Sequence, residues 1–173
     1  RKCLIALSAI AYLLHNLGMN PITKNHTAVL QHLQRTLPAE CLITDGAGLR
    51  PYETDGLTAI REMPWVVVLP ETEAQVVDVM AICRQHGVPV IPRGAGTGLS
   101  GGARPHKDGV VLGLSKMNKI LSVDPDNRVA QVQPGVRNLA ISNAAKPHGL
   151  YYAPDPSSQI ACSIGGNVAE NAG

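Results

Sequence analysis

Residues 65–102 read WVVVLPETEAQVVDVMAICRQHGVPVIPRGAGTGLSGG, and this stretch decides the fold. It opens with an unbroken apolar run at 65–69, which is typical of a strand covered on both faces. Residues 88–91 form a second short apolar run of the same kind. A helical segment separates the two runs, so we predict a strand, helix, strand unit whose two strands are parallel.

The helix between these strands carries signals at both ends. Thr72 and Gln75 have the spacing of a capping box at its start. Gly87 stands where a left-handed residue ends a helix. The apolar face between the two signals comprises Val76, Val77, Val79, Met80, Ile82 and Cys83.

The rest of the core is predicted to contain short strands at 110–114, 120–123 and 129–132. The sequence DPDN at 124–127 predicts a turn, so the last two strands should form a hairpin. A second amphipathic helix is expected at 137–146, where a proline and a glycine follow and stop it. We therefore predict an α+β fold with mixed strand directions.

The first part of the chain is less regular. Residues 1–18 contain two basic residues and an apolar run, which we interpret as upstream translation before Met19, with a signal peptide as the alternative. Apolar residues at helical spacing predict a helix at 25–37. Residues 41–63 contain turn-forming residues and little periodicity, so we expect an irregular lead-in there.

Composition and charge exclude several classes of protein. The 173 residues are 45% hydrophobic and 16% charged, as in globular domains. A net charge of +2 is too small for a surface that neutralises a run of nucleic-acid phosphates. The cysteines lie far apart without a C-x-x-C pair, which indicates reduced thiols, no zinc site and a cytoplasmic setting. They are Cys3, Cys41, Cys83 and Cys162.

The loop at 93–102, RGAGTGLSGG, carries the clearest functional signal. Five glycines among the nine residues 94–102 leave backbone N–H groups unscreened and allow the positive φ angles that an anion-binding loop needs. Thr97 and Ser100 add hydroxyl donors. We interpret the loop as a cradle for a diphosphate, and a merely flexible turn is the alternative.

Three known motifs overlap this loop, and none has the context it requires. The dinucleotide pattern G-x-G-x-x-G at 96–101 must open a helix, which residues 103–109 with Pro105 cannot form. The hydrolase pattern G-x-S-x-G around Ser100 fails for the same reason. No Gly-Lys-Ser/Thr follows the glycines, which excludes an ATP site of the Walker type.

A second glycine-rich element lies near the end of the chain, with PDPSS at 154–158, SIGGN at 163–167 and NAG at 171–173. Two such loops can hold one extended ligand between them. Asn167 and Asn171 would then offer amide hydrogen bonds to its ring or ribityl atoms. The alternative is a pair of surface turns without a ligand.

These motifs occur in an order that resembles the FAD-binding domain of the vanillyl-alcohol oxidase and p-cresol methylhydroxylase family. The resemblance covers 52–173 and rests on VVLP, VPVIPRGAGTGLSGG, PDPSS and GGNVAENAG taken together. Within that family it is greatest to the glycolate oxidase D subunits. It implies that 19–62 leads into the domain and that 63–173 is its first part, incomplete at the C-terminal end.

The resemblance also implies which residues bind FAD. Family members with a covalent flavin have a histidine where this chain has Thr97, so the FAD is expected to be noncovalent. For Asp155 a purely turn-forming role is the alternative, because prolines flank it. The residues implied for the diphosphate are Arg93, Gly94, Ala95, Gly96, Thr97, Gly98 and Ser100. Those implied for the flavin side are Pro154, Asp155, Ser163, Gly165, Gly166, Asn167 and Asn171.

The function that the resemblance implies is oxidation of a 2-hydroxy acid, either glycolate to glyoxylate or D-lactate, by hydride transfer to FAD. The family's catalytic groups come from a later substrate domain, so none is expected among these residues. Implied partners are other subunits of a glycolate oxidase complex, including an iron-sulfur subunit, in the cytoplasm or peripheral at the inner face of the membrane. The alternatives are a non-catalytic flavin-binding subunit of such a complex and, third, a hydrolase that uses Ser100.

Overall fold

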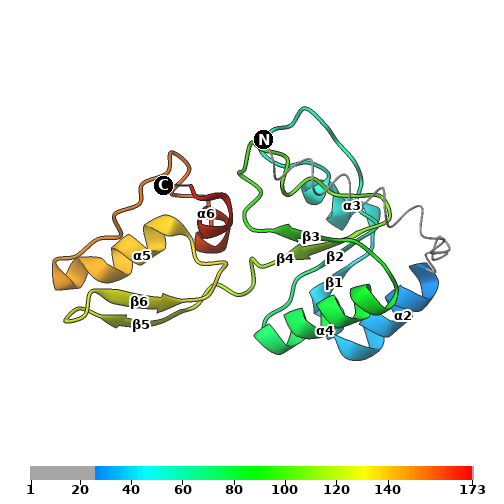
Figure 1. Ribbon diagram of the computed structural model, residues 1–173, viewed down its shortest axis with the longest axis horizontal. Coiled ribbons are helices and arrows are strands. Elements are labelled where there is room, and N and C mark those ends of the chain that lie inside the picture. Colours follow the sequence, from blue (N-terminus) through cyan, green and yellow to red (C-terminus); the bar gives the residue numbers. More distant parts are fainter. Residues whose placement is uncertain (1–25, 173) are drawn as a thin grey trace, which may run out of the picture.

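The computed structural model describes residues 26–172. The predictions for 1–18 and Met19 lie outside the described residues. Figure 1 shows two layered parts side by side, a four-stranded sheet with helices and a two-stranded hairpin with helices. The predicted α+β class with mixed strand directions is confirmed.

The four-stranded sheet contains β1 (Leu42–Ile43), β2 (Val66–Val68), β3 (Val90–Arg93) and β4 (Val110–Gly113) in the order β1-β2-β4-β3. β4 pairs parallel with both β2 and β3, so β2 and β3 are parallel as predicted but are not adjacent. All four residues of β4 are buried, as expected for an inner strand with both faces covered. The carboxyl ends of β3 and β4 therefore meet at one edge of the sheet.

Helices cover the sheet on both faces. On one face lie α2 (His26–Thr36), close to the helix predicted at 25–37, and α4 (Glu73–Gln85). Their apolar residues form the larger core cluster with β2 and β4. On the other face lie α3 (Gly46–Leu49) and η2 (Arg50–Tyr52), which pack on a smaller cluster. The buried residues of that smaller cluster are Leu49, Val67, Ile91 and Val111.

The predicted signals at the two ends of α4 are confirmed. Thr72 Oγ1 accepts a hydrogen bond of 3.3 Å from the Gln75 N–H, and Gln75 Oε1 accepts one of 3.3 Å from the Thr72 N–H. These two bonds satisfy donors that a helix start otherwise leaves unpaired. Gly87 has a φ of 63°, the left-handed conformation that commonly follows a helix.

The second part of the structure is built on a hairpin. β5 (Ile120–Asp124) pairs antiparallel with β6 (Val129–Val132) across the turn predicted at 124–127, so the predicted hairpin is confirmed. α5 (Asn138–Ala145) packs on β5. α6 (Ile164–Glu170) lies between this hairpin part and the four-stranded sheet (Figure 1). The hairpin part and α6 thus face the strand ends of the sheet.

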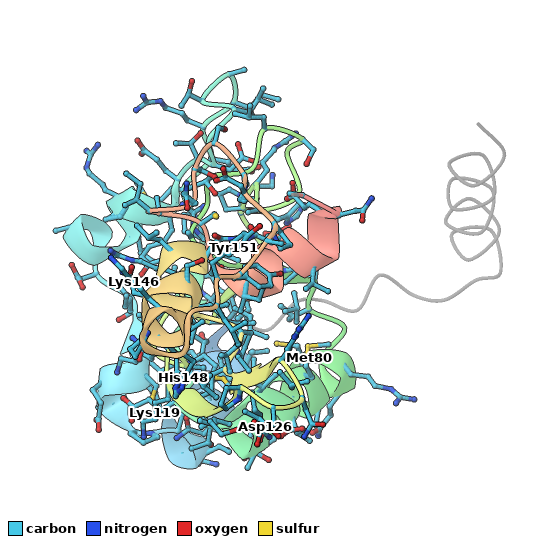
Figure 2. The ribbon with its side chains drawn as sticks, turned by 90° about the vertical axis from the view of Figure 1, so that its left-hand side faces the viewer. Met80, Lys119, Asp126, Lys146, His148 and Tyr151 are labelled. Atoms are coloured by element: carbon cyan, nitrogen blue, oxygen red, sulfur yellow. The ribbon has the colours of Figure 1, made fainter. Side chains whose placement is uncertain are left out.

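The end of the molecule formed by the hairpin exposes polar side chains together with the apolar Leu121, Val129 and Tyr151. Figure 2 views the structure from this end and labels the exposed side chains of Lys119, Asp126, Lys146 and His148 there. Asp126 lies in the turn at the tip of the hairpin.

The lead-in at 41–63 is more regular than predicted. It contains β1, α3 and η2, all of them short. β1 has only two residues and pairs antiparallel with β2, with Leu42 opposite Val68. No periodic pattern can mark so short a strand, because its pairing depends on a partner distant in the sequence.

The glycine-rich segment at 163–167 is also different from the predicted loop, since 164–170 form helix α6. The Gly165 N–H donates a hydrogen bond of 2.8 Å to the Pro134 carbonyl. A Cβ atom at Gly165 would lie only 2.8 Å from the Pro134 Cβ. Close packing that glycine permits thus stabilises a helix whose local propensity is poor.

Candidate functional site

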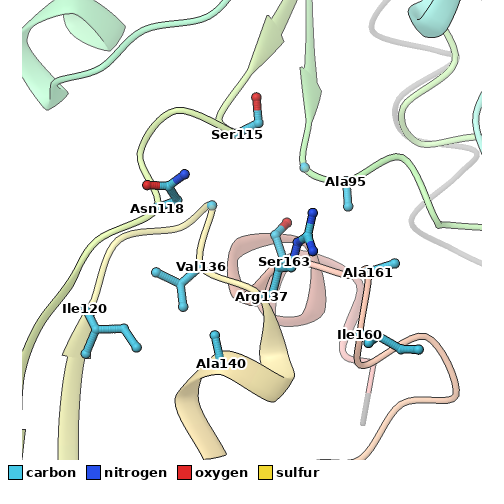
Figure 3. Close-up of a pocket in the computed structure, with 12 residues that line it drawn as sticks. Ala95, Ser115, Asn118, Ile120, Val136, Arg137, Ala140, Ile160, Ala161 and Ser163 are labelled. Carbon is cyan, nitrogen blue, oxygen red and sulfur yellow. The ribbon is translucent and has the colours of Figure 1, made fainter. Parts of the chain in front are cut away.

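A pocket of about 710 Å³ lies between the two parts of the structure, at the carboxyl ends of β3 and β4. Ligands of open α/β sheets bind at such strand ends. Figure 3 shows Ala95 and Ser115 on the sheet side of the pocket, and Ile120, Val136 and Ala140 on the side of the hairpin and α5. The lining residues are Gly94, Ala95, Ser115, Asn118, Ile120, Gly135, Val136, Arg137, Ala140, Ile160, Ala161 and Ser163.

Backbone hydrogen bonds hold the pocket walls together. The Gly135 N–H donates to the Met117 carbonyl at 2.8 Å, and the Ile164 N–H donates to the Val136 carbonyl at 2.8 Å. A Cβ atom at Gly135 would lie 2.7 Å from the Met117 carbonyl oxygen, so only glycine fits there. The connection from β4 to β5, the connection from β6 to α5 and the start of α6 are therefore fixed against one another.

The glycine loop packs closely on α6. A Cβ atom at Gly94 would contact the Ser163 Oγ, and one at Gly98 would lie 2.7 Å from the Glu170 Oε1. Ser100 also donates a hydrogen bond of 3.2 Å to the Glu170 Oε2. The structure thus brings the two predicted glycine-rich segments together.

Two buried polar atoms at and just after the start of α6 lack hydrogen-bond partners within the described part of the chain. They are the Ser163 Oγ and the Asn167 Nδ2, in residues that are 5% and 6% exposed. Leaving a buried donor unsatisfied costs about 1 to 3 kcal/mol. Ser163 lines the pocket, so a ligand there can satisfy its hydroxyl.

The charge of the pocket favours an anion. Arg137 is the one charged residue among the described residues that line it, and its side chain is exposed. Figure 3 shows the Arg137 guanidinium beside Ser163. The Glu170 carboxylate lies against the glycine loop, but it does not line the pocket.

Arg93 was expected to contact the diphosphate, but its side chain does not line the pocket. Its guanidinium donates to the Thr54 carbonyl at 2.8 Å and to the Pro51 carbonyl at 3.3 Å. It also lies over the Tyr52 ring, 5.4 Å from the centroid. Burial lowers the pKa of Arg93, while Tyr52 and Asp55 act in the opposite direction.

Only some of the other predicted site residues line the pocket. Gly94, Ala95 and Ser163 line the pocket. The side chain of Asn138 donates a hydrogen bond of 3.1 Å to the Pro154 carbonyl, which ties the PDPSS segment to α5. The residues predicted to bind the cofactor that do not line the pocket are Gly96, Thr97, Gly98, Ser100, Pro154, Asp155, Gly165, Gly166, Asn167 and Asn171.

Sequence reasoning missed three polar lining residues, Ser115, Asn118 and Arg137. Ser115 follows the carboxyl end of β4, so the rule that ligands bind at such ends would have indicated it. Arg137 directly precedes α5, and the sequence pattern indicates only that it begins this helix. No local pattern distinguishes Asn118 from a surface turn residue.

Comparison with known proteins agrees with this geometry. The family model described as FAD binding domain matches residues 64–173. The chain belongs to this family of FAD-binding domains. FAD, the cofactor predicted from the two glycine-rich segments, is therefore confirmed at the level of the family. The absence of a helix in 103–109 agrees with the exclusion of a dinucleotide site of the Rossmann type.

Two relatives with assigned activities match much of this FAD-binding domain. Glycolate oxidase subunit GlcD of Escherichia coli is 56% identical over 149 residues, which is 86% of this chain and 30% of that protein. D-lactate dehydrogenase of Anaerostipes hadrus is 44% identical over 110 residues, which is 64% of this chain and 23% of that protein. The chain thus spans less than a third of the length of either relative.

Solved structures show the same fold. An alkyldihydroxyacetonephosphate synthase matches with a TM-score of 0.75 at 22% identity, over 90% of this chain and 31% of that one. A p-cresol methylhydroxylase with substrate bound matches with a TM-score of 0.74 at 24% identity, over 85% of this chain and 30% of that one. The predicted p-cresol methylhydroxylase type of fold is confirmed.

Two further searches concern the described residues 26–172 alone. No helix in this range is both long and apolar enough to cross a lipid bilayer. No three His, Cys, Asp or Glu side chains in the range are grouped so that they could bind a metal ion.

Proposed function

We propose that this chain is the FAD-binding part of an oxidoreductase that oxidises a 2-hydroxy acid, either glycolate to glyoxylate or D-lactate. The observation that carries the proposal is the buried Ser163 hydroxyl, which has no hydrogen-bond partner among residues 26–172, lies against the glycine loop at Gly94 and lines the pocket. The relatives that match this chain, GlcD and a D-lactate dehydrogenase, support the choice of substrate class.

The residues of the site fit FAD. A pocket of about 710 Å³ is within the range of ligand sites, roughly 300 to 1,000 Å³. A Cβ atom at Gly94 would meet the Ser163 Oγ and one at Gly98 the Glu170 carboxylate, so these glycines let α6 approach the loop and place Ser163 beside the pocket. Arg137 supplies a cation to the same pocket, and the Ser163 hydroxyl, which has no partner among residues 26–172, offers a hydrogen bond.

Bound in this site, FAD would supply the two-electron acceptor for oxidation of the substrate's carbinol carbon. The chain's own residues bind and orient the cofactor. The glycine loop presents backbone N–H groups, and Ser115, Asn118 and Arg137 line the space next to it. The backbone hydrogen bonds from Gly135 to Met117 and from Ile164 to Val136 keep these groups in fixed positions. Such preorganisation lowers the entropic cost of binding an extended cofactor.

The FAD is proposed to be noncovalent. Thr97 stands at the position where relatives with a covalent flavin have histidine, and a threonine hydroxyl is not a comparable nucleophile at neutral pH. The Thr97 carbonyl instead lies against Gly56, where a Cβ atom would approach it to 2.6 Å. Its backbone therefore serves the packing of the loop.

The proposed partners are other subunits of a glycolate oxidase complex, including an iron-sulfur subunit that passes electrons onward. GlcD is named as a subunit, which supports an assembly of this kind. The proposed location is the cytoplasm or the inner face of the membrane as a peripheral protein. The buried, unpaired thiols of Cys41, Cys83 and Cys162 support a reducing compartment.

A flavin reduction assay tests the proposal. The full-length protein is mixed anaerobically with glycolate or D-lactate, and its visible absorbance is followed. We expect one of these acids to bleach the flavin. A protein that retains FAD but is bleached by neither acid would instead be the non-catalytic flavin-binding subunit. A persisting esterase activity without flavin would favour the hydrolase hypothesis.

A further inference from the structure

Arg93 is unusual because its charge is buried behind the glycine loop. The residue is 8% exposed, and its guanidinium bonds the backbone carbonyls of Thr54 and Pro51 at 2.8 and 3.3 Å. No carboxylate of the described residues lies within ion-pairing distance of it. These two carbonyl oxygens accept hydrogen bonds from Arg93, but they do not neutralise its charge.

The guanidinium packs directly on the backbone of the loop. Gly96 has a φ of +74°, and a Cβ atom there would lie 2.5 Å from the Arg93 Cζ. Gly56 braces the next part of the loop, since a Cβ atom there would lie 2.6 Å from the Thr97 carbonyl and 2.9 Å from that of Gly98. The segment 51–56 and Arg93 together form the back of the loop.

A buried carboxylate lies in the same segment. Asp55 is 6% exposed, and its Oδ1 accepts a hydrogen bond of 3.0 Å from the Leu57 N–H. Its Oδ2 is buried without a hydrogen-bond partner among the described residues. A buried cation, Arg93, and a buried carboxylate, Asp55, therefore both lie behind the loop, and Arg93 contacts it. Buried charges act across a low effective dielectric, so their fields reach beyond their own contacts.

We propose that Arg93 and Asp55 tune the affinity of the glycine loop for a diphosphate from behind, without contacting the ligand. Arg93 raises the positive potential at the loop, and Asp55 lowers it. This inference rests on the proposed binding of FAD. It assigns Arg93 a positioning and electrostatic role in place of direct contact with the diphosphate, and it assigns a role to Asp55.

The test compares two ligands that share the flavin ring. Full-length apoprotein is titrated with FAD and with riboflavin, which lacks phosphate, by the quenching of flavin fluorescence. We expect Arg93→Gln to weaken FAD binding about tenfold or more and to change riboflavin binding by less than about twofold. We expect Asp55→Asn to tighten FAD binding by about two- to fivefold, because Asn Oδ1 still accepts from Leu57.

Controls separate charge from structure. Arg61→Gln removes an exposed cation outside the segment 51–56 that pairs with Glu53, and it should leave both affinities unchanged. Arg93→Lys keeps the charge but loses the forked donor that bonds two carbonyls, so its FAD affinity should fall less than that of Arg93→Gln. If Arg93→Gln does not fold, the FAD affinities of Arg93→Lys and Asp55→Asn still test the inference.

Three results would overturn the inference. Equal losses of FAD and riboflavin binding in Arg93→Gln would show a purely structural role. Weaker FAD binding in Asp55→Asn would show that the charge does not act as proposed. A loss in Arg93→Lys as large as in Arg93→Gln would show that the guanidinium shape alone matters. Failure of the wild-type apoprotein to bind either ligand would instead contradict the proposed function itself.

Discussion

The Ser100 hydroxyl donates a hydrogen bond of 3.2 Å to the Glu170 Oε2, joining the glycine loop to the end of α6 across 70 residues of sequence. The same carboxylate lies beside Gly98 and Gly102, where Cβ atoms would come within 2.7 and 3.4 Å of Oε1. A negative charge at this position opposes the binding of a diphosphate on the loop.

Removing that charge should therefore strengthen cofactor binding. Glu170→Gln keeps an amide oxygen that can accept from Ser100, and we expect it to tighten FAD binding about two- to fivefold. Titration of the full-length apoprotein with FAD measures the change. Asp126→Asn, at the exposed tip of the hairpin, is the control and should have no effect. Unchanged or weaker binding in Glu170→Gln would contradict this electrostatic account.

Gly98→Val should separate folding from flavin retention. The atoms nearest to the new Cβ belong to the end of the flexible Glu170 side chain, which can move, so the unfolding free energy should change by about 1 kcal/mol. The branched side chain would cover the loop backbone and abolish flavin retention. Gly46→Val is the matched control, because a Cβ atom there has nothing within 4 Å. Normal flavin content in a folded Gly98→Val protein would refute the assignment of the loop.

Ser163→Ala tests the unpartnered hydroxyl. Because the Ser163 Oγ has no partner within residues 26–172, its removal should leave the stability of the apoprotein unchanged or slightly higher. FAD affinity should fall roughly five- to tenfold, the value of one hydrogen bond to a ligand. Thermal melting of the apoprotein and FAD titration give the two readings. Equal stability losses with and without FAD would show that the hydroxyl has only a structural role.

Cys83 predicts a loss of stability in alkali. The side chain is 1% exposed, and burial raises the pKa of its thiol from 9.0 to about 11. The folded state therefore favours the protonated thiol, and this contribution is complete below pH 9.0 and is lost as the pH rises to about 11. Thermal melting across this range should show a steeper decline for the wild type than for Cys83→Ala. Parallel declines would contradict the prediction.

Local signals predicted the elements that depend on neighbouring residues. The capping box of Thr72 and Gln75 and the terminal Gly87 fixed the bounds of α4 to within a residue or two. The turn at 124–127 predicted the hairpin, because its hydrogen bonds lie within four residues. In such elements the sequence near each residue determines its conformation.

Non-local contacts decided what the sequence could not show. The insertion of β4 between β2 and β3 depends on pairing of strands far apart in the chain. Helix α6 depends on the close contact of Gly165 with Pro134, which overrides its helix propensity. The glycine loop was found from sequence, but the pocket also takes Ser115, Asn118 and Arg137 from separate connections. The roles proposed for the site residues stay predictions.

The central claim is that this chain binds FAD noncovalently in the pocket beside its glycine loop and the start of α6. The most direct measurement is the visible absorption spectrum of the purified full-length protein, followed by acid precipitation and mass analysis of the supernatant. The account predicts a yellow protein that releases intact FAD into the supernatant. A folded but colourless protein would contradict the claim, and a flavin that stays with the precipitate would contradict its noncovalent attachment.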